Sequence, residues 1–492
     1  MSRTQLRLAA LSGARWTMAS RVGLQLLTWP ITLVVMRLLE PSDYGLFALA
    51  MVTTGFVSLF SELGLGVALV QARQVDEKVA RAACGAILAL NSIVALVLVL
   101  LAPWAADWFD EPDLEAVIKV LTLELLVSSF AVVPQALLER QLQFRQLSIS
   151  LMLAAACGSV ATLATAWLGF GVWSFVIGTL TLASVRSAAM LVFHGRIVWP
   201  SFRSDFSSIR PMLQFSSHVV ASRTLWYWYG QSDQVILGRV LHASMLGFYS
   251  VAAQLAALPA NKVMEAVNRV ALPIIARLRD DPVELRNTHE RLVRLVASYG
   301  FALCWGLAAV APEFVLVVLG EKWYLSILPL TLLSLIAPLR MLCALHNTIT
   351  TAAGTPQAAT KELAFASFLI PAALLAGTWS AGLNGAAIAW ALAFPLVYLL
   401  SNALTCAALG SKALNGIRPL AAPLAAAVSM SGGIWLARNH LPGAPAPLLL
   451  LGVELVVGAL CYALTLRILA PALVREVLSL VRDLLRPGRA SS

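Results

Sequence analysis

The chain has 492 residues, of which 59% are hydrophobic and only 12% charged, with a formal net charge of +10 and a mean hydropathy of +0.81. This composition excludes an ordinary water-soluble protein, in which about 25% of the residues are charged. Because about 20 apolar residues cross the hydrocarbon core of a bilayer, the sequence predicts an all-α integral membrane protein with little chain left for a soluble domain.

Fourteen apolar runs are long enough to cross a membrane. We predict transmembrane helices at 11–38, 44–71, 82–104, 114–135, 147–168, 171–193, 212–240, 246–275, 292–318, 326–352, 361–380, 384–408, 418–437 and 447–468. Pro259 and Pro273 interrupt the eighth. No small-residue cleavage site follows the first apolar run, so we expect it to remain as a span and not to be removed as a signal peptide.

The basic residues are concentrated in alternate loops. The N-terminus, the even-numbered loops and the C-terminal tail hold most of them, whereas the third loop, around 107–115, is acidic. Because cytoplasmic loops retain Lys and Arg, this pattern places both termini in the cytoplasm, which requires an even number of spans. The positive charge is therefore explained by topology, and we expect no nucleic-acid partner.

Residues 471–487 follow the last predicted span. Most of their Leu and Val side chains fall on one helical face, and their Arg side chains fall elsewhere. This pattern predicts an amphipathic helix lying on the cytoplasmic leaflet.

Several kinds of chemistry lack their sequence signals. No phosphate-binding G-x-x-x-x-G-K-[ST] motif occurs, the six histidines are scattered, and the six cysteines stand singly within apolar runs. We therefore expect no ATP hydrolysis, cofactor, metal site or disulfide, and we predict that the protein is not an enzyme.

The two halves of the chain contain a short internal repeat. Arg37-Leu-Leu-Glu-Pro-Ser-Asp-Tyr-Gly-Leu-Phe aligns with Arg239-Val-Leu-His-Ala-Ser-Met-Leu-Gly-Phe-Tyr, 202 positions later. The same offset pairs Arg21 with Arg223 and Gly45 with Gly247. Since 202 residues hold six spans, the repeat is parallel, with a pseudo-twofold axis along the membrane normal.

This repeat predicts the domain organisation. We expect an N-terminal lobe at 1–193, an inter-lobe loop at 194–211, a C-terminal lobe at 212–408, an appended pair of spans within 409–468, and a cytoplasmic tail at 469–492.

Four stretches resemble one family. They begin at Arg37 (quoted above), at Glu62 in Glu62-Leu-Gly-Leu-Gly-Val-Ala-Leu-Val-Gln, at Leu137 in Leu137-Leu-Glu-Arg-Gln-Leu-Gln-Phe-Arg, and at Asp233 in Asp233-Gln-Val-Ile-Leu-Gly-Arg-Val-Leu-His-Ala-Ser-Met-Leu-Gly-Phe-Tyr. The sequence resembles the polysaccharide transporter family, the Wzx-like lipid-linked oligosaccharide flippases of the multidrug/oligosaccharidyl-lipid/polysaccharide (MOP) exporter superfamily, and is most similar to exporters of colanic-acid or xanthan type. It departs from them at His242, where a small residue is more usual.

The resemblance implies two six-helix lobes around a cavity that opens alternately to each side of the bacterial inner membrane. It also implies that the substrate is a polyprenyl-pyrophosphate-linked oligosaccharide repeat unit, flipped from the cytoplasmic to the periplasmic leaflet for export of an exopolysaccharide, O-antigen or capsule. A coupling cation (H⁺ or Na⁺) and a polymerase or co-polymerase of the same pathway are the partners expected of a monomeric transporter.

Charged and aromatic residues within the spans are the candidate site, because a charge inside a bilayer is costly and normally faces protein or water. Arg21 and Arg223 occupy equivalent helices, and two guanidiniums could grip a pyrophosphate; binding to helix carbonyls or to an acid is the alternative. Arg269 could join them or form a helix-surface pair with Glu265, and Asn268 could contact sugar or pack.

Trp226 and Tyr227, close to Arg223, could stack on sugar rings or anchor their helix. Glu62 and Glu124 could bind a coupling cation or form structural pairs. Asp233 could lock a gate, although an acid facing an interface is the default interpretation.

Two other functions remain open. A cation-coupled drug exporter of the same superfamily would favour an acid-lined cavity. An integral-membrane glycosyltransferase or polymerase acting on polyprenyl-linked sugars would need a site in an external loop, for which the acidic cluster at 107–115 is the candidate.

Overall fold

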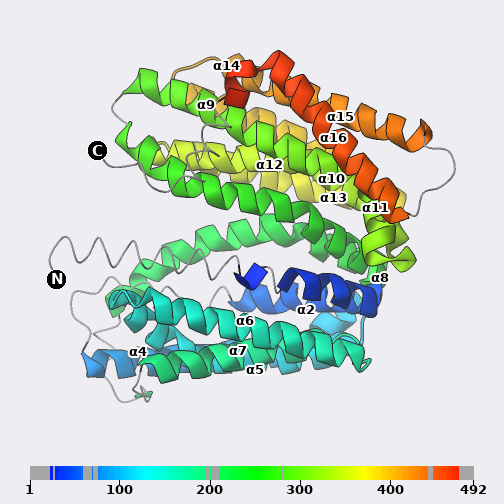
Figure 1. The fold of residues 1–492 in the computed structure, drawn as a ribbon. Helices are drawn as coiled ribbons and strands as arrows, with labels where there is room; N and C mark the ends of the chain where they lie inside the picture. The colour runs from blue at the N-terminus through cyan, green and yellow to red at the C-terminus, as the bar shows by residue number, and fades with distance from the viewer. Residues whose placement is uncertain are drawn as a thin grey trace. The chain divides into compact units, whose positions relative to one another are not determined.

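The computed structural model describes residues 23–25, 28–58, 69, 76–194, 200–201, 210–278, 281–440 and 447–475. This part of the chain is all helical (Figure 1). The α-helices are α2 (Pro41–Ser58), α4 (Glu77–Phe109), α5 (Asp113–Arg140), α6 (Phe144–Trp167), α7 (Trp173–His194), α8 (Arg210–Arg277), α9 (Pro282–Gly300), α10 (Gly306–Ala309), α11 (Ala311–Phe314), α12 (Ile327–Ala352), α13 (Gln357–Ala408), α14 (Ala413–Ile417), α15 (Ala421–His440) and α16 (Pro447–Leu469). Short π-helical or 3₁₀ segments, η2 (Phe301–Trp305), η3 (Val315–Leu319), η4 (Glu321–Ser326) and η5 (Arg418–Leu420), join several of them.

The described residues contain ten helices long and apolar enough to cross a membrane, or eleven if the bent pair Gly23–Leu38 and Pro41–Ser58 is one span. The protein is thus an all-helical, multi-span membrane protein. The count is below the fourteen predicted spans in part because α8 and α13 are each continuous over two of them. The first two predicted spans, 11–38 and 44–71, also extend beyond the described residues. Helix α8 holds the predicted 212–240 and 246–275, with a non-helical residue at His242, and α13 holds 361–380 and 384–408.

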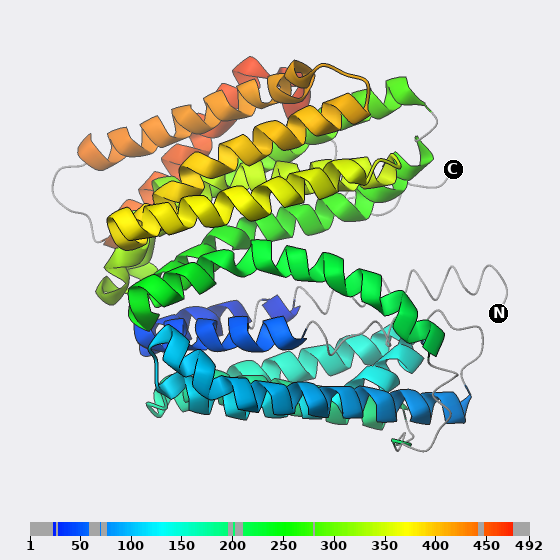
Figure 2. The same cartoon turned by 180° about the vertical axis from the view of Figure 1, so that it is seen from behind.

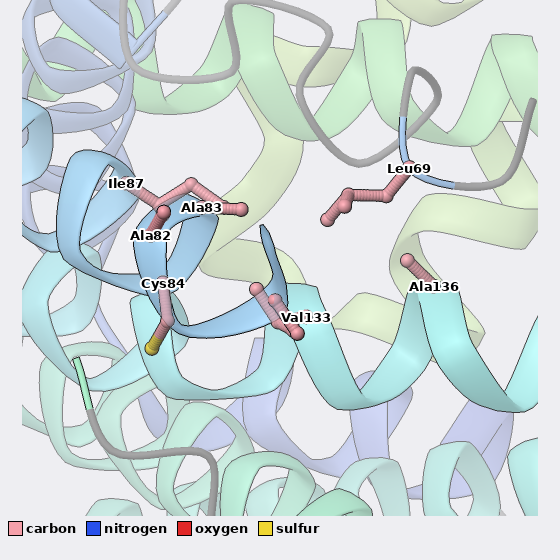
Figure 3. Packing of buried hydrophobic residues seen from close by; sticks show 8 residues of the cluster. Leu69, Ala82, Ala83, Cys84, Ile87, Val133 and Ala136 are labelled. Carbon is pink, nitrogen blue, oxygen red and sulfur yellow. The ribbon is translucent and has the colours of Figure 1, made fainter. Parts of the chain in front are cut away.

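The chain forms two compact units, Met1–Gly247 and Phe248–Ser492. In the first unit, α4 packs on α5, α5 on α7, and α6 on α7. Figure 3 shows one of its cores, in which the small side chains of Ala83 and Cys84 from α4 lie near Val133 and Ala136 of α5. Small residues let helix backbones approach closely, which replaces the hydrophobic driving force that is missing between helices in lipid.

The first unit also contains a reciprocal contact between the repeated segments. A Cβ atom on Gly45 would lie 1.7 Å from the carbonyl oxygen of Ala243, and one on Gly247 would lie 1.7 Å from the carbonyl oxygen of Pro41. Pro41 and Ala243 are themselves 202 positions apart, as the two glycines are. Each repeat therefore presents its glycine to the equivalent backbone position of the other, as a twofold contact requires.

The bend in α8 lies next to this contact. His242 has φ 66° and ψ 168°, a left-handed conformation that L-residues rarely adopt and that breaks the helix. The following backbone N–H, that of Ala243, donates to the Glu111 carboxylate at 2.7 Å. The acidic segment after α4 thus supplies the hydrogen bond that the break removes from the helix.

In the second unit, α12 packs on α13 and on α9. Helix α13 is a hairpin whose two arms run side by side (Figure 2), with left-handed φ at Gly382. A Cβ on Gly377 would lie 2.4 Å from the carbonyl oxygen of Gly385, and Ser401 bonds to Glu362 further along the same two arms. The 52 residues of α13 therefore fold back on themselves at Ala381–Gly382.

The C-terminal part of the described chain is α15 and α16, which pack together. Of the predicted tail helix 471–487, residues 471–475 are helical and the rest lies outside the described residues.

Candidate functional site

Five of the predicted site residues have no described side chain. Arg21 and Glu62 lie outside the described residues, and Arg223, Asn268 and Arg269 lie on α8 at positions whose side chains are not described. Their assignment to pyrophosphate, sugar or cation therefore stays a prediction. The backbone does place Arg223, Asn268 and Arg269 on a helix, as expected.

The aromatic cluster on α8 is divided by its contacts. Tyr227 turns to α2, where its hydroxyl donates to the carbonyl oxygen of Val52 at 2.7 Å and its ring lies 6.0 Å from that of Phe56. Trp226 is 48% exposed and meets Tyr229 edge-on with ring centroids 5.9 Å apart. The Tyr227 hydroxyl thus holds α8 to α2, and of the two predicted residues Trp226 is the one whose ring is exposed, as the ring of Trp228 also is.

Asp233, the predicted gate residue, is buried in the same arm of α8. Its Oδ1 accepts the backbone N–H of Gln234 at 2.8 Å. Ser232 beside it is fully buried, and the side-chain oxygen of Gln231 is buried without a hydrogen-bond partner. Asp233 therefore belongs to a polar stretch of α8 inside the first unit, and its gating role stays a prediction.

Glu124 belongs to a polar stripe between α5 and α7. It is close enough to Arg186 to interact with it electrostatically. Arg186 donates to the side-chain oxygen of Gln135 at 2.5 Å, and Gln135 donates to Glu139 at 2.9 Å. Of the two interpretations that the sequence left open for Glu124, the arginine neighbour favours a structural pair.

A second polar cluster lies in the second unit, where α9, α12 and α13 meet. Ser401 donates to Glu362 Oε2 at 2.6 Å, and the same hydroxyl lies 3.1 Å from Nδ1 of His346. The centroid of the His289 ring lies 5.5 Å from that of His346, and the Tyr398 ring stacks on the His346 ring with centroids 5.9 Å apart. All five side chains are buried, between 0% and 7% exposed.

Sequence reasoning missed this cluster, which we name the His–Ser–Glu array (His346, Ser401 and Glu362). Glu362 follows Lys361 at the start of a predicted span, where charged residues are common and do not indicate a site. His289 lies just outside a predicted span. The signal that was available was His346 itself, a polar residue within an apolar run.

An ionic cluster ties the last two helices to the rest of the second unit. Arg438 of α15 bonds to Glu313 of α11, to Glu454 of α16 at 3.0 Å, and to the carbonyl oxygen of Ala309 at 3.0 Å. The Glu454 carboxylate is fully buried. A single guanidinium therefore serves two carboxyl groups here, one from α11 and one from α16.

Comparison with solved structures shows which fold the chain shares. The chain shares its fold with a structure described as lipid II flippase MurJ in an inward closed conformation, with a TM-score of 0.72 and 12% sequence identity, over 94% of this chain and all of that one. An inward-facing multidrug resistance MATE family transporter of the MOP superfamily gives a TM-score of 0.58 at 15% identity, over 78% of this chain and 95% of that one. The fold is therefore that of the MOP-type helical membrane transporters.

Comparison of sequences narrows the class. The model of the family described as "Polysaccharide biosynthesis protein" matches residues 34–328, more than half of the chain. The chain belongs to this family, the Wzx-like branch of the MOP superfamily, and is a multi-pass membrane transporter of polysaccharide biosynthesis.

Named relatives cover most of the chain. The lipopolysaccharide biosynthesis protein WzxC of Escherichia coli (strain K12) is 26% identical over 81% of this chain and 80% of its own length. The teichuronic acid biosynthesis protein TuaB of Bacillus subtilis (strain 168) is 22% identical over 98% of each. The succinoglycan biosynthesis transport protein ExoT of Rhizobium meliloti (strain 1021) is 26% identical over 63% of this chain and 62% of its own length.

Proposed function

We propose that the protein flips polyprenyl-pyrophosphate-linked oligosaccharide repeat units from the cytoplasmic to the periplasmic leaflet of the bacterial inner membrane, by alternating access, for export of a polysaccharide. The observation that carries this proposal is the match of residues 34–328 to a polysaccharide biosynthesis family in a chain whose fold follows a lipid II flippase over 94% of its length. The three relatives described above are named for lipopolysaccharide, teichuronic acid and succinoglycan, which are all polysaccharides.

The topology that we propose has fourteen spans, with both termini in the cytoplasm. Helices α8 and α13 then supply two spans each, and 52 residues of α13 would extend about 78 Å if straight, far beyond a bilayer of about 30 Å. The proposed parallel repeat of 202 residues is supported by the reciprocal contact of Gly45 with Ala243 and of Gly247 with Pro41.

Substrate binding in this proposal centres on Arg223 and its repeat partner Arg21. Arginine suits a pyrophosphate because its planar fork of N–H donors matches two phosphate oxygens at once. Trp226, exposed one turn further along α8, is placed to stack on a sugar ring or on the lipid. The hydroxyl of its neighbour Tyr227 donates a hydrogen bond to the Val52 carbonyl oxygen of α2, so Tyr227 would contribute at most its ring to substrate binding.

The test uses cells that lack the protein and measures which leaflet holds the lipid-linked oligosaccharide. We expect it to accumulate on the cytoplasmic leaflet and to reach the outer leaflet again when the intact chain is restored. The Arg223→Ala variant should reach the membrane at the normal level but restore no export. The Arg467→Ala variant, changed at an exposed position in the last turn of α16, should restore export fully. Accumulation of unpolymerised units on the outer leaflet would contradict the proposal and favour a polymerase.

A drug exporter is the second candidate, because the fold also follows a multidrug resistance transporter, with a TM-score of 0.58. Such a function predicts that cells lacking the protein become sensitive to drugs while their polysaccharide is unchanged. The same deletion strain therefore separates the two functions.

A further inference from the structure

The His–Ser–Glu array is unusual for the inside of a membrane protein because three groups that exchange protons are joined in one line. Glu362 and Ser401 come from the two arms of α13, and His346 comes from α12. His346 is 0% exposed, Ser401 1% and Glu362 7%. Buried polar groups are costly unless they are paired, so an array of this kind is retained for a reason beyond packing.

Counting protons along the array fixes the state of the imidazole. A serine hydroxyl has one proton, and Ser401 gives it to the Glu362 carboxyl at 2.6 Å, the length of an O–H···O⁻ bond. The Ser401 oxygen can then only accept from His346, so Nδ1 of His346 carries the proton of the neutral ring. The lone pair of this imidazole is therefore on Nε2, which is buried and has no hydrogen-bond partner.

Few charged groups surround the Nε2 lone pair of His346. From α9, the His289 ring faces His346, and its Nε2 is also buried without a partner. From α13, Tyr398 stacks on His346, with a buried, unpartnered hydroxyl. The other titratable or charged groups that face the array come from α12. Cys343, together with the amide of Asn347, faces Glu362. Arg340 interacts electrostatically with Cys343, and its Cζ lies 5.1 Å from the centroid of the Trp390 ring.

We propose that the His–Ser–Glu array is a proton-binding site that couples transport to the proton gradient, an inference that rests on the proposed flippase function. A proton from water adds to Nε2 of His346, and the array changes from a net charge of −1 to zero. Transfer of a proton through Ser401 can place it on Glu362 instead, leaving a neutral imidazole and a neutral carboxyl. No other bond is formed or broken.

The chemistry of the array favours a proton over a metal cation. Na⁺ and Mg²⁺ need several oxygen ligands around one point. Here the Ser401 hydroxyl gives its proton to Glu362, the free lone pair is a nitrogen, and the described residues contain no group of three or more metal-ligating side chains. In the packing described, the unprotonated array holds its net charge away from water, which is costly and favours uptake of a proton. The proton can reach or leave the array only if α9, α12 and α13 let water in, which links proton binding to a change in packing.

The coupling is tested with the full chain in proteoliposomes that contain a labelled polyprenyl-pyrophosphate-linked oligosaccharide. The quantity measured is its steady-state ratio between the leaflets at different imposed pH gradients. One proton per cycle predicts about a tenfold change in this ratio for each unit of pH gradient. Glu362→Gln and His346→Asn should bring the ratio near one at every gradient, because the first leaves a protonated His346 as an unbalanced buried charge and the second removes the nitrogen that takes up the proton. His440→Asn, an exposed histidine at the end of α15, is the matched control and should keep the tenfold dependence.

Proton binding itself is measured on the same membranes by pH-difference infrared spectroscopy. The wild type should show carboxyl and imidazole bands that change together, and these should be lost in both array variants and kept in His440→Asn. If the wild type moves no oligosaccharide at any gradient, the proposed flippase function fails, and the infrared bands still decide whether the array binds a proton. Transport by the wild type that is indifferent to the pH gradient, array variants that keep the tenfold dependence, or the absence of the paired bands would overturn the proton site.

Discussion

The reciprocal glycine contact makes a quantitative prediction about the repeat. A methyl group at Gly45 or at Gly247 would lie 1.7 Å from a backbone carbonyl oxygen, whereas Cβ atoms essentially never approach other atoms closer than 3.0 Å. Alanine at either position must therefore separate α2 from the bend of α8 by at least about 1.3 Å, because backbone cannot move aside as a flexible side chain does. Overpacking of this kind costs about 1–3 kcal/mol, offset by up to about 1 kcal/mol from the better helix propensity of alanine.

The net loss of about 1–2 kcal/mol should be visible in thermal unfolding followed by tryptophan fluorescence. For a unit of this size each kcal/mol moves the Tm by about 2–4 °C, so Gly45→Ala and Gly247→Ala should each lower it by roughly 2–8 °C. Gly230→Ala, on the same arm of α8 with nothing within 4 Å of its Cβ, is the control and should leave the Tm unchanged or raise it.

The double variant tests the twofold character of the contact. Because both methyl groups widen the same helix crossing, Gly45→Ala with Gly247→Ala should cost less than the two single losses added together. Strict additivity, or a loss in Gly230→Ala as large as in the other two, would refute the argument that these glycines form one shared crossing.

Three further predictions concern side chains on the described helices. Arg438→Ala leaves Glu454 buried without its cation, so we expect a loss of about 3–5 kcal/mol in thermal unfolding, and an unchanged Tm would contradict the ionic cluster. Glu313→Ala leaves Arg438 paired with the buried Glu454, so the loss in thermal unfolding should be clearly smaller than in Arg438→Ala, and an equal loss would contradict this order. Tyr227→Phe removes the hydrogen bond to α2 and should lower the free energy of unfolding by about 0.5–1.5 kcal/mol while polysaccharide export continues. The control is Tyr324→Phe, at an exposed tyrosine. Loss of export at unchanged stability would instead assign Tyr227 to substrate binding.

The positions of most helices could be predicted from apolar run length alone. The predicted spans 326–352 and 447–468 match α12 at Ile327–Ala352 and α16 at Pro447–Leu469, because a run of bilayer length has to be helical to pair its backbone groups. The ends of helices that extend beyond the apolar core could be predicted less closely. Helix α4 runs from Glu77 to Phe109, well beyond the predicted 82–104. The predicted span 292–318 is divided near Val310 into short helical and π-helical pieces, which a hydropathy pattern does not show.

The site was less predictable than the fold, for a physical reason. Periodicity identifies residues that share a face of one helix, but the array joins His346 of α12 to Glu362 and Ser401 on the two arms of α13, with His289 of α9 beside it. Only tertiary packing brings these residues together. The role of Tyr227 shows the same limit, since its position on α8 was evident but its partner, the Val52 carbonyl oxygen, is 175 positions away.

The ionic cluster at Arg438 also has a consequence for the biogenesis of the protein. Apart from Arg467 in its last turn, the one charged residue of helix α16 is Glu454, about 10 Å from the first residue of the helix, and a charge at such a depth costs a few kcal/mol on insertion into a bilayer. Arg438 is only 16 positions earlier in the chain and can neutralise that charge as the hairpin forms. The final two helices are therefore built to enter the membrane together, and a ribosome that stopped after residue 440 would leave Arg438 with Glu313 but without the buried carboxylate of Glu454.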